Sequence, residues 1–358
     1  MNVDRNSLGR ATLARQMLLE RTTVKPIVAI ERLVGLQAQL AKPPFVGLWT
    51  RIAGFERAQL AKLFHDRKAV RATSLRGTLH VMSAKDFVDL RMALQPMLTA
   101  GMTSILRDRG KGIEHDKLLA EARKLLDKQS LTPDAIRNGL LVKLPDWEVR
   151  AMGYAVRMLL PLVQVPTDDA WAFPGAAEVT IAETWLGKPF GKGTLHALVR
   201  RYLAAFGPAS VADAQTWSGI AGLKPVFDEL RDELVTAKDG KRELFDLPDA
   251  PRPDAKTVAP VRFLPDFDNL VLGHADRTRF IDDEHRGRVV TKNLQVRATL
   301  LVDGRVAATW KIERSKAAAT VVLEPFGTIA KKHRAAIEHE GEALARFVEP
   351  DATTFAVR

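Results

Sequence analysis

Gln37 and Gln39 stand one residue apart in the segment GLQAQL at 35–40, shortly before two prolines. Apolar residues at helical spacing upstream predict a helix over 26–36, and the prolines prevent its continuation. The two glutamines then lie at or just past a helix end, where in an extended turn residues two apart point to the same side. Their amides would hold a water molecule or a sugar between them. Glutamine is also a common solvated helix residue, so both interpretations stay open from this segment alone.

A second group of polar side chains occupies 263–285, the segment FLPDFDNLVLGHADRTRFIDDEH. Its members are Asp266, Asp268, Asn269, His274, Asp276, Asp282, Asp283 and His285. Such residues bind metals in hydrolases, but HExxH, HxH and calcium-loop spacings do not occur. Asp and Asn also cap helices and form turns; we favour that role and predict no metal site. In a middle interpretation, the segment positions the C-terminal unit against the first unit and supports the site through Asp266, Asp268, Asn269 and His274.

His80 is the third candidate, in the segment RGTLHVMS. It alternates with Leu79 and Val81 on a predicted strand and so faces away from both. Close to Arg71 and Arg76 in the sequence, it would contact a phosphate or a displaced base; it would equally serve as an ordinary polar residue of a strand. The motifs GxSxG, P-loop and GxGxxG do not occur, so acyl transfer, nucleotide hydrolysis and dinucleotide redox chemistry have no support.

Composition narrows the class of protein. The 358 residues include 54 Lys and Arg against 43 Asp and Glu, a net charge of +11, which favours a polyanionic partner: nucleic acid first, an anionic membrane surface second. The absence of cysteine excludes disulfides, thiolate nucleophiles, zinc fingers and Cys-ligated clusters. Neither an apolar run of about 18–20 residues nor a secretory pattern is present. We therefore expect a folded protein of the reducing cytoplasm, without a membrane partner.

The elements that must position these residues repeat along the chain. Helices at 9–20, 26–36, 45–53 and 56–65 precede strand-like runs at 68–75 and 77–83, the order of a winged helix. A long helix over 84–106 leads to the basic loop 107–111. A second unit has helices at 115–128, after Thr132-Pro133 and at 146–159, then a wing pairing 162–166 with 170–174 across 167–169. A third has helices at 194–206, after Ser210 and at 222–233, then a hairpin at Asp239-Gly240.

After the linker 248–256 the pattern becomes β-rich. Strand-like runs occupy 286–290, 296–302, 305–313 and 318–326, with a hairpin at Asp303-Gly304, followed by a helix over 328–347 and a last strand at 353–358. We predict an α+β fold with three tandem winged-helix units and a C-terminal β-barrel, or curved sheet, crossed by a helix. The predicted units are 1–110, 111–183, 184–253 and 254–358.

Several segments in this order resemble one known family, the winged-helix DNA glycosylases of the AlkZ and YcaQ type. They are LARQMLLER at 13–21, VGLQAQ at 34–39 with PPFVGLWTRI following, RGTLHVM at 76–82, GPASVADAQTWSGI at 207–220 and FLPDFDNLVLGHADR at 263–277. The resemblance implies three tandem winged helices and a β-barrel around a C-shaped, basic channel for double-stranded DNA, and excision of alkylated purines, in some members from interstrand crosslinks.

The resemblance also implies which residues act. The family's catalytic motif maps onto Gln37 and Gln39, which places the chain with the AlkZ-like Gln-x-Gln branch and apart from the Gln/Asp branch. Residues expected to contact DNA are Arg71, Arg76, His80, Lys111 and Arg277. The expected protein is a monomeric, metal-free and cofactor-free glycosylase of the bacterial cytoplasm, associated with the nucleoid.

An amide limits the chemistry. Glutamine does not titrate, so it is no ordinary general base, although its oxygen orients water and faces a cationic sugar with a negative dipole. This suffices for a leaving group that is already cationic, such as an N7-alkylguanine or N3-alkyladenine, and predicts little activity on uracil. With 6% aromatic residues, a shallow site suits the composition better than a deep stacking pocket. The alternatives are a non-catalytic winged-helix DNA-binding protein or regulator and a metal-dependent hydrolase.

Overall fold

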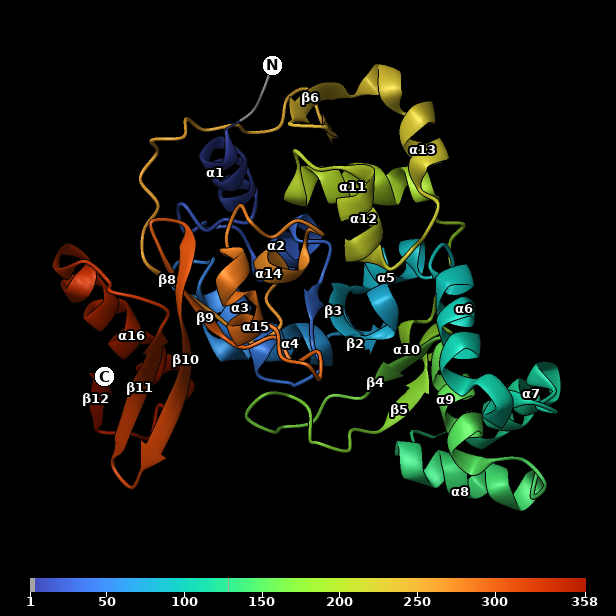
Figure 1. Cartoon of the computed structure of the whole chain (residues 1–358). Coiled ribbons are helices and arrows are strands. Elements are labelled where there is room, and N and C mark those ends of the chain that lie inside the picture. The colour runs from blue at the N-terminus through green and yellow to red at the C-terminus, as the bar shows by residue number, and fades with distance from the viewer. Residues whose placement is uncertain (1–3, 128) are drawn as a thin grey trace.

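The computed structural model describes residues 4–127 and 129–358 and confirms the expected α+β class (Figure 1). Helices predominate as far as the third predicted unit, and strands predominate in the C-terminal part. In the described ranges, no helix is long and apolar enough to cross a bilayer.

The first unit contains the expected helices at shifted bounds. They are α1 (Arg5–Arg15), α2 (Pro26–Arg32), α3 (Pro43–Trp49) and α4 (Arg57–His65). The prolines after the glutamine motif begin α3, because the first turn of a helix does not need their missing N–H groups. The expected hairpin is present: β2 (Ala69–Thr73) and β3 (Leu79–Ser83) are antiparallel and joined through the short 3-10 helix η1 (Leu75–Gly77).

The hairpin belongs to a sheet that reaches into the second predicted unit. β1 (Leu36–Gln37), β4 (Leu162–Gln164) and β5 (Val179–Ile181) complete five strands in the order β1-β3-β2-β4-β5. The predicted pairing of 162–166 with 170–174 is wrong, because β4 pairs with β5. Trp171 and Phe173 instead pack edge-on against the rings of Phe45 and Phe64, and this burial draws their segment away from the sheet.

The predicted helix over 84–106 is interrupted. α5 (Ala84–Leu90) and α6 (Gln95–Leu106) are separated by a turn at 91–94. Pro96 lies in the first turn of α6, where a proline is tolerated, and it prevents one continuous helix across the junction. The basic loop that follows contains the 3-10 helix η2 (Arg107–Gly110).

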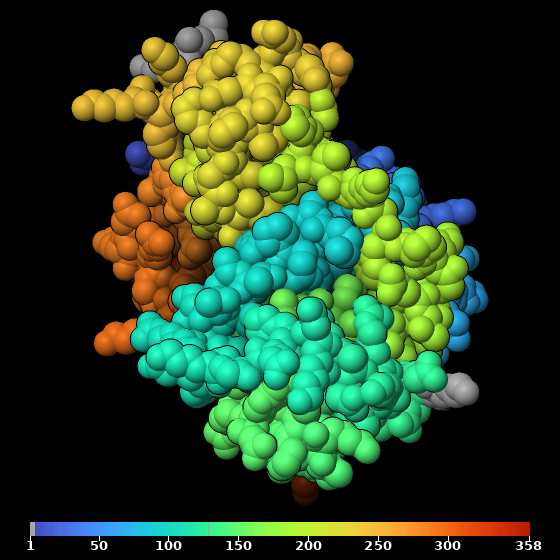
Figure 2. Space-filling view, turned by 90° about the vertical axis from the view of Figure 1, so that its right-hand side faces the viewer, coloured from blue at the N-terminus to red at the C-terminus, as the bar shows by residue number. Residues whose placement is uncertain are grey.

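Two further groups of helices follow. The second group is α7 (His115–Leu126), α8 (Pro133–Lys143), α9 (Val149–Leu159) and α10 (Ala182–Leu186). The third group is α11 (Leu195–Phe206), α12 (Val211–Ser218) and α13 (Lys224–Glu229), followed by η3 (Arg231–Glu233). Thr132 caps α8 and Ser210 caps α12, as predicted. The hairpin of β6 (Val235–Asp239) and β7 (Arg242–Asp246) is also confirmed. Figure 2 shows α6 as a band between this third group and α7–α9.

The C-terminal part contains a sheet in the order β12-β11-β10-β9-β8. Its elements are β8 (Arg262–Leu264), α14 (Asn269–Leu272), η4 (Asp283–His285), α15 (Arg286–Val289), β9 (Thr299–Val302), β10 (Arg305–Ser315), β11 (Ala318–Pro325), η5 (Lys331–His333), α16 (Arg334–Val348) and β12 (Thr354–Val357). The sheet is open, with β8 and β12 as its edges, and α16 packs on it. Of the two predicted forms, it is therefore the curved sheet; the described residues do not form a closed barrel. The run 286–290 is largely helical and not a strand.

A buried ion pair connects the first unit with the C-terminal part. The guanidinium of Arg51, two residues after the end of α3, contacts both carboxylate oxygens of Asp268 at 2.8 Å, and both side chains are fully buried. Arg51 also donates to the backbone oxygens of Gln16 and Gly47. A buried pair with this many bonds specifies one arrangement of the segments it joins.

Candidate active site

A sharp turn between α2 and β1 places Gln37. Gly35 in this turn has φ of +92°, and a Cβ there would lie 2.9 Å from the carbonyl oxygen of Val81, so the position requires glycine. From the C-terminal part, the side-chain amide of Asn269 donates to the carbonyl oxygens of Gly35 at 2.7 Å and Leu33 at 3.4 Å. The backbone just before Gln37 is therefore fixed by contacts with two other segments, one around Val81 and one around Asn269.

Gln37 lies opposite His80 in the β1–β3 register, and it is 7% exposed. Arg76 Nη2 donates to Gln37 Oε1 at 2.7 Å and lies 3.4 Å from His80 Nε2. His80 Nδ1 lies 3.1 Å from the carbonyl oxygen of Thr78. A neutral His80 with its proton on Nδ1 satisfies both contacts, donating to Thr78 and accepting from Arg76. The orientation of the Gln37 amide is thus fixed by Arg76.

Gln39 lies just beyond β1 and is exposed. Its Oε1 accepts a hydrogen bond from the backbone N–H of Leu79 at 2.9 Å. Arg71 fixes the backbone around it, donating to the carbonyl oxygens of Ala38 at 2.9 Å and Gln39 at 3.2 Å. Both side-chain oxygens of the motif accept one hydrogen bond from the protein, and each has a second lone pair available for a water molecule.

Arg76 is itself positioned by the third group of helices. Its backbone is left-handed, with φ of +54°, and its Nη1 donates to the carbonyl oxygen of Trp217 near the end of α12. Gly219, which follows α12, approaches so closely that a Cβ there would lie 3.0 Å from Arg76 Cα. Segments near residues 36, 78, 218 and 269 therefore meet around one glutamine.

The electrostatic character of the site is positive. Arg71, Arg76 and Arg277 form no ion pair with a carboxylate in the part of the chain that the structure describes. Burial lowers the pKa of Arg71 to about 10, and burial together with the charge of Arg277 lowers the pKa of Arg76 to about 10. All three remain guanidinium cations at neutral pH.

His80 has no charge at neutral pH. Burial, and then the positive charge of Arg76, lowers its pKa to about 3. It is therefore a neutral hydrogen-bonding partner across the physiological range and cannot supply a proton there.

The other two residues predicted to contact DNA, Arg277 and Lys111, differ in how near they lie to the glutamines. Arg277 is near enough to Arg76 for its charge to lower the pKa of that group, whereas Lys111 is exposed and pairs with Asp108 at 2.7 Å in the loop after α6. None of the described hydrogen bonds or ion pairs connects Lys111 with the two glutamines.

Most members of the Asp- and His-rich segment have structural contacts. Asp268 pairs with Arg51, and Asp266 accepts a hydrogen bond from the Ala298 N–H at 3.2 Å. His274 Nε2 lies 2.9 Å from the carbonyl oxygen of Phe206, and its pKa is lowered to about 3, mainly by burial. Among the described residues, no three His, Asp or Glu side chains are grouped as a metal site requires. Among the described hydrogen bonds, it is Asn269 of this segment that reaches the turn before Gln37.

Comparison with known proteins assigns the family. The model of the AlkZ-like family, described as "DNA glycosylase AlkZ-like", matches residues 30–347. The chain belongs to the AlkZ-like DNA glycosylase family. It is thus an enzyme that acts on N-glycosyl bonds in DNA.

Two comparisons agree with this assignment. The chain is 25% identical to an "Interstrand DNA cross-link repair glycosylase" of Streptomyces sahachiroi over 93% of this chain and 94% of that protein. Its fold matches the solved structure of the DNA glycosylase AlkZ from the same organism, with a TM-score of 0.81, 22% identity and full coverage of both chains.

Three positioning residues of this AlkZ-like glycosylase were not singled out from the sequence. They are Trp217, Gly219 and Arg157, which donates to the carbonyl oxygen of Gly77 in η1 at 3.0 Å. The first two lie within the segment GPASVADAQTWSGI at 207–220 that carried the family resemblance, so a signal for them was present. No pattern in α9 distinguishes Arg157 from the other arginines of the chain.

Proposed function

We propose that this AlkZ-like glycosylase hydrolyses the N-glycosidic bond of cationic alkylated purines in double-stranded DNA, N7-alkylguanine and N3-alkyladenine above all, with Gln37 and Gln39 as the catalytic residues. The observation that carries the proposal is the arrangement of Gln37: a buried amide held by Arg76, beside a neutral His80, with no carboxylate bonded to either glutamine among the described contacts.

This arrangement suits a reaction that needs no proton donor. Breaking an N-glycosidic bond passes through an oxocarbenium-like sugar. A base alkylated at N7 carries a positive charge and leaves as a neutral molecule, so an acid is not required. Water then adds to the sugar carbon and gives up its extra proton to the surrounding solvent. The free lone pairs on the two glutamine oxygens can direct that water molecule. The proposed steps use no metal and no cofactor.

The arginines support the binding part of the proposal. Arg71, Arg76 and Arg277 are positive and lack carboxylate partners in the described residues, so we assign them to the phosphates on either side of the lesion. Their positive charge would oppose a cationic sugar; their role is therefore to hold the DNA, and the glutamine dipoles face the reacting carbon. Affinity should fall steeply with salt concentration, since phosphate contacts release counterions.

The substrate range and cellular role that we propose are based on the similar Streptomyces protein. Because the similar Streptomyces protein is a crosslink repair glycosylase by name, we extend the proposal to bulky N7 adducts and interstrand crosslinks, in base excision repair or in resistance to a natural genotoxin. We also propose that three winged-helix units precede the C-terminal sheet, that the protein binds DNA as a monomer, and that it acts at the bacterial nucleoid.

The test compares two lesions in one duplex sequence. Purified protein is incubated with duplexes carrying either N7-methylguanine or uracil, and the released base is quantified by chromatography. We expect release of N7-methylguanine and at most trace release of uracil. Efficient uracil excision would contradict the mechanism, because uracil is a neutral base that needs assistance as a leaving group. An enzyme inert on every cationic purine would contradict the proposed substrate class.

A further inference from the structure

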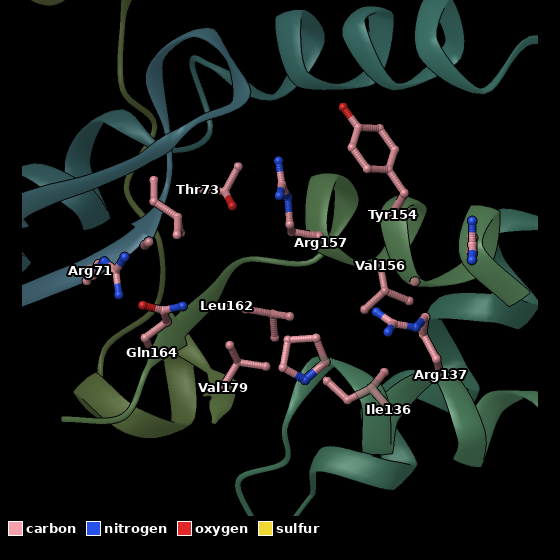
Figure 3. Close-up of a pocket in the computed structure, with 15 residues that line it drawn as sticks. Arg71, Thr73, Ile136, Arg137, Tyr154, Val156, Arg157, Leu162, Gln164 and Val179 are labelled. Atoms are coloured by element: carbon pink, nitrogen blue, oxygen red, sulfur yellow. The ribbon is translucent and has the colours of Figure 1, made fainter. Parts of the chain in front are cut away.

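A cavity of about 580 Å³ lies between the first sheet and helices α8 and α9 (Figure 3). Its sheet wall includes Arg71, Leu162 and Gln164, and its helical wall includes Ile136 and Tyr154. The lining contains four arginines and no acidic residue; they are Arg71, Arg137, Arg150 and Arg157. Nothing in the glutamine mechanism uses this cavity.

The cavity and the glutamine site share one hairpin but lie on different sides of it. Gln37 and His80 are partners across adjacent strands, and cross-strand partners point to the same face of a sheet. Ala72, the partner of His80 on β2, also borders the cavity. The alternate residues Arg71 and Leu79 point to the other face and line the cavity. The hairpin that orients both glutamines is therefore also a wall of the cavity.

Contacts in the hairpin bring the two sites close together. The backbone N–H of Leu79 holds Gln39 Oε1, while the Leu79 side chain lines the cavity. Arg71 lines the cavity and donates to the backbone of Gln39, and Arg157 donates to Gly77, the residue after Arg76. The residues that hold Gln39 and the turn beside Arg76 are therefore also residues of the cavity wall.

The lining has the chemistry of a nucleotide site. Arg71 is largely buried and lacks a carboxylate partner in the described structure, and Arg157 is likewise without one; Arg137 alone of the four pairs with an acid, Asp134. The floor is apolar, formed by Ile136, Val156, Leu162 and Val179. Gln164 Oε1 is buried with no hydrogen-bond partner, so it can accept a bond from a donor on a ligand.

We infer that this cavity binds one unpaired nucleotide of the DNA, next to the lesion but distinct from it, with its phosphate against Arg71 and Arg157 and its base over the apolar floor. A duplex phosphate has neither an apolar surface to pack on the floor nor a donor for the buried acceptor. A base has a flat apolar face and N–H donors. The lesion itself stays at Gln37 on the opposite face of the sheet. The inference rests on the proposed function for its biological meaning.

Gly153 provides the variant that tests it. This glycine lies within α9 and lines the cavity, and a Cβ there would lie 2.7 Å from Arg137 Cγ. Gly153→Leu therefore adds bulk at the cavity wall and displaces the Arg137 side chain, without removing a charge. Gly101→Leu is the matched control, because Gly101 lies within α6 and a Cβ there has no atom within 4 Å. Arg150→Glu is a second variant, which reverses a charge on an exposed side chain at the cavity rim.

The experiment measures binding of two undamaged duplexes that differ by a single unpaired adenosine nucleotide, in fluorescence anisotropy at fixed salt. We expect wild-type protein and Gly101→Leu to bind the bulged duplex about tenfold more tightly. Gly153→Leu and Arg150→Glu should lose this preference, Gly153→Leu with unchanged affinity for the paired duplex. Free deoxyadenosine monophosphate should compete for the preference at concentrations where inorganic phosphate does not.

Any of four results would overturn the inference. They are equal wild-type affinity for the two duplexes, a preference that survives in Gly153→Leu, a preference that disappears equally in Gly101→Leu, and equal competition by inorganic phosphate. Because the duplexes carry no lesion, the result does not depend on base release. Failure of the inference is thereby distinguishable from failure of the proposed function, which the N7-methylguanine assay tests by itself.

Discussion

At the scale of single residues, the site is notable for having no group that titrates near neutral pH. Gln37 and Gln39 are amides, His80 has its pKa lowered to about 3, and the pKa values of Arg71 and Arg76 stand at about 10. An enzyme built this way keeps one protonation state over a broad pH range.

The pH profile of base release follows from this. Between pH 5.5 and 8.5, the single-turnover rate on N7-methylguanine DNA should vary by no more than about twofold, since no group of the site changes charge there. Gln39→Glu introduces a carboxyl group with an ordinary pKa of about 4.3, so its profile should acquire an acid limb below roughly pH 5. A bell-shaped wild-type profile centred near pH 7 would show that a titrating acid or base takes part.

At the scale of elements, the sequence predicted single hairpins and helix caps better than it predicted which distant segments contact one another. Hairpins at Asp239-Gly240 and Asp303-Gly304 and the helix caps at Thr132 and Ser210 have local signals, and all four are present. The contact of Arg76 with Gln37 is different, because it depends on the β1–β3 register and on α12, far along the chain.

Two wrong predictions have the same origin. The break between α5 and α6 is signalled by Pro96, but apolar spacing continues across it and favours one helix. The segment 170–174 has the composition of a strand, and only the tertiary packing of Trp171 and Phe173 removes it from the sheet. The local sequence pattern shows which secondary structures a segment can adopt. Long-range packing determines which of them forms.

The turn before β1 gives a stability prediction. Gly35→Ala should lower the free energy of unfolding by about 1–3 kcal/mol, because alanine meets both an unfavourable positive φ and the Val81 carbonyl. Chemical denaturation measures this. Gly54→Ala is the control, since Gly54 has φ of +67° but open space around a Cβ, and it should cost less. Equal losses in the two variants would show that the Val81 contact has no effect.

At the scale of the whole molecule, two buried neutral histidines couple stability to pH. His80 and His274 have pKa values of about 3 in the folded protein, against 6.5 ordinarily. Between these values the unfolded chain binds protons that the folded chain excludes. The free energy of unfolding should therefore fall as pH decreases below about 6.5, by up to about 1.4 kcal/mol per pH unit for each histidine.

Denaturant titrations from pH 7.5 to 5.5 test this coupling. Wild-type protein should lose stability over the interval, and His274→Gln should show a shallower slope because one excluded proton is removed. His339, which is exposed, provides the control, and His339→Gln should retain the wild-type slope. Unchanged wild-type stability across the interval would mean that neither histidine is held neutral by the fold.

We propose that Gln37 carries the chemistry of this AlkZ-like glycosylase, and the most direct test is the single-turnover rate of N7-methylguanine release by Gln37→Ala, with duplex affinity measured in parallel. We expect a loss of about 10²–10³-fold in rate, near-wild-type affinity, and a wild-type rate for the control variant Gln129→Ala, at an exposed position. A Gln37→Ala protein that releases the base at the wild-type rate would contradict this role of Gln37.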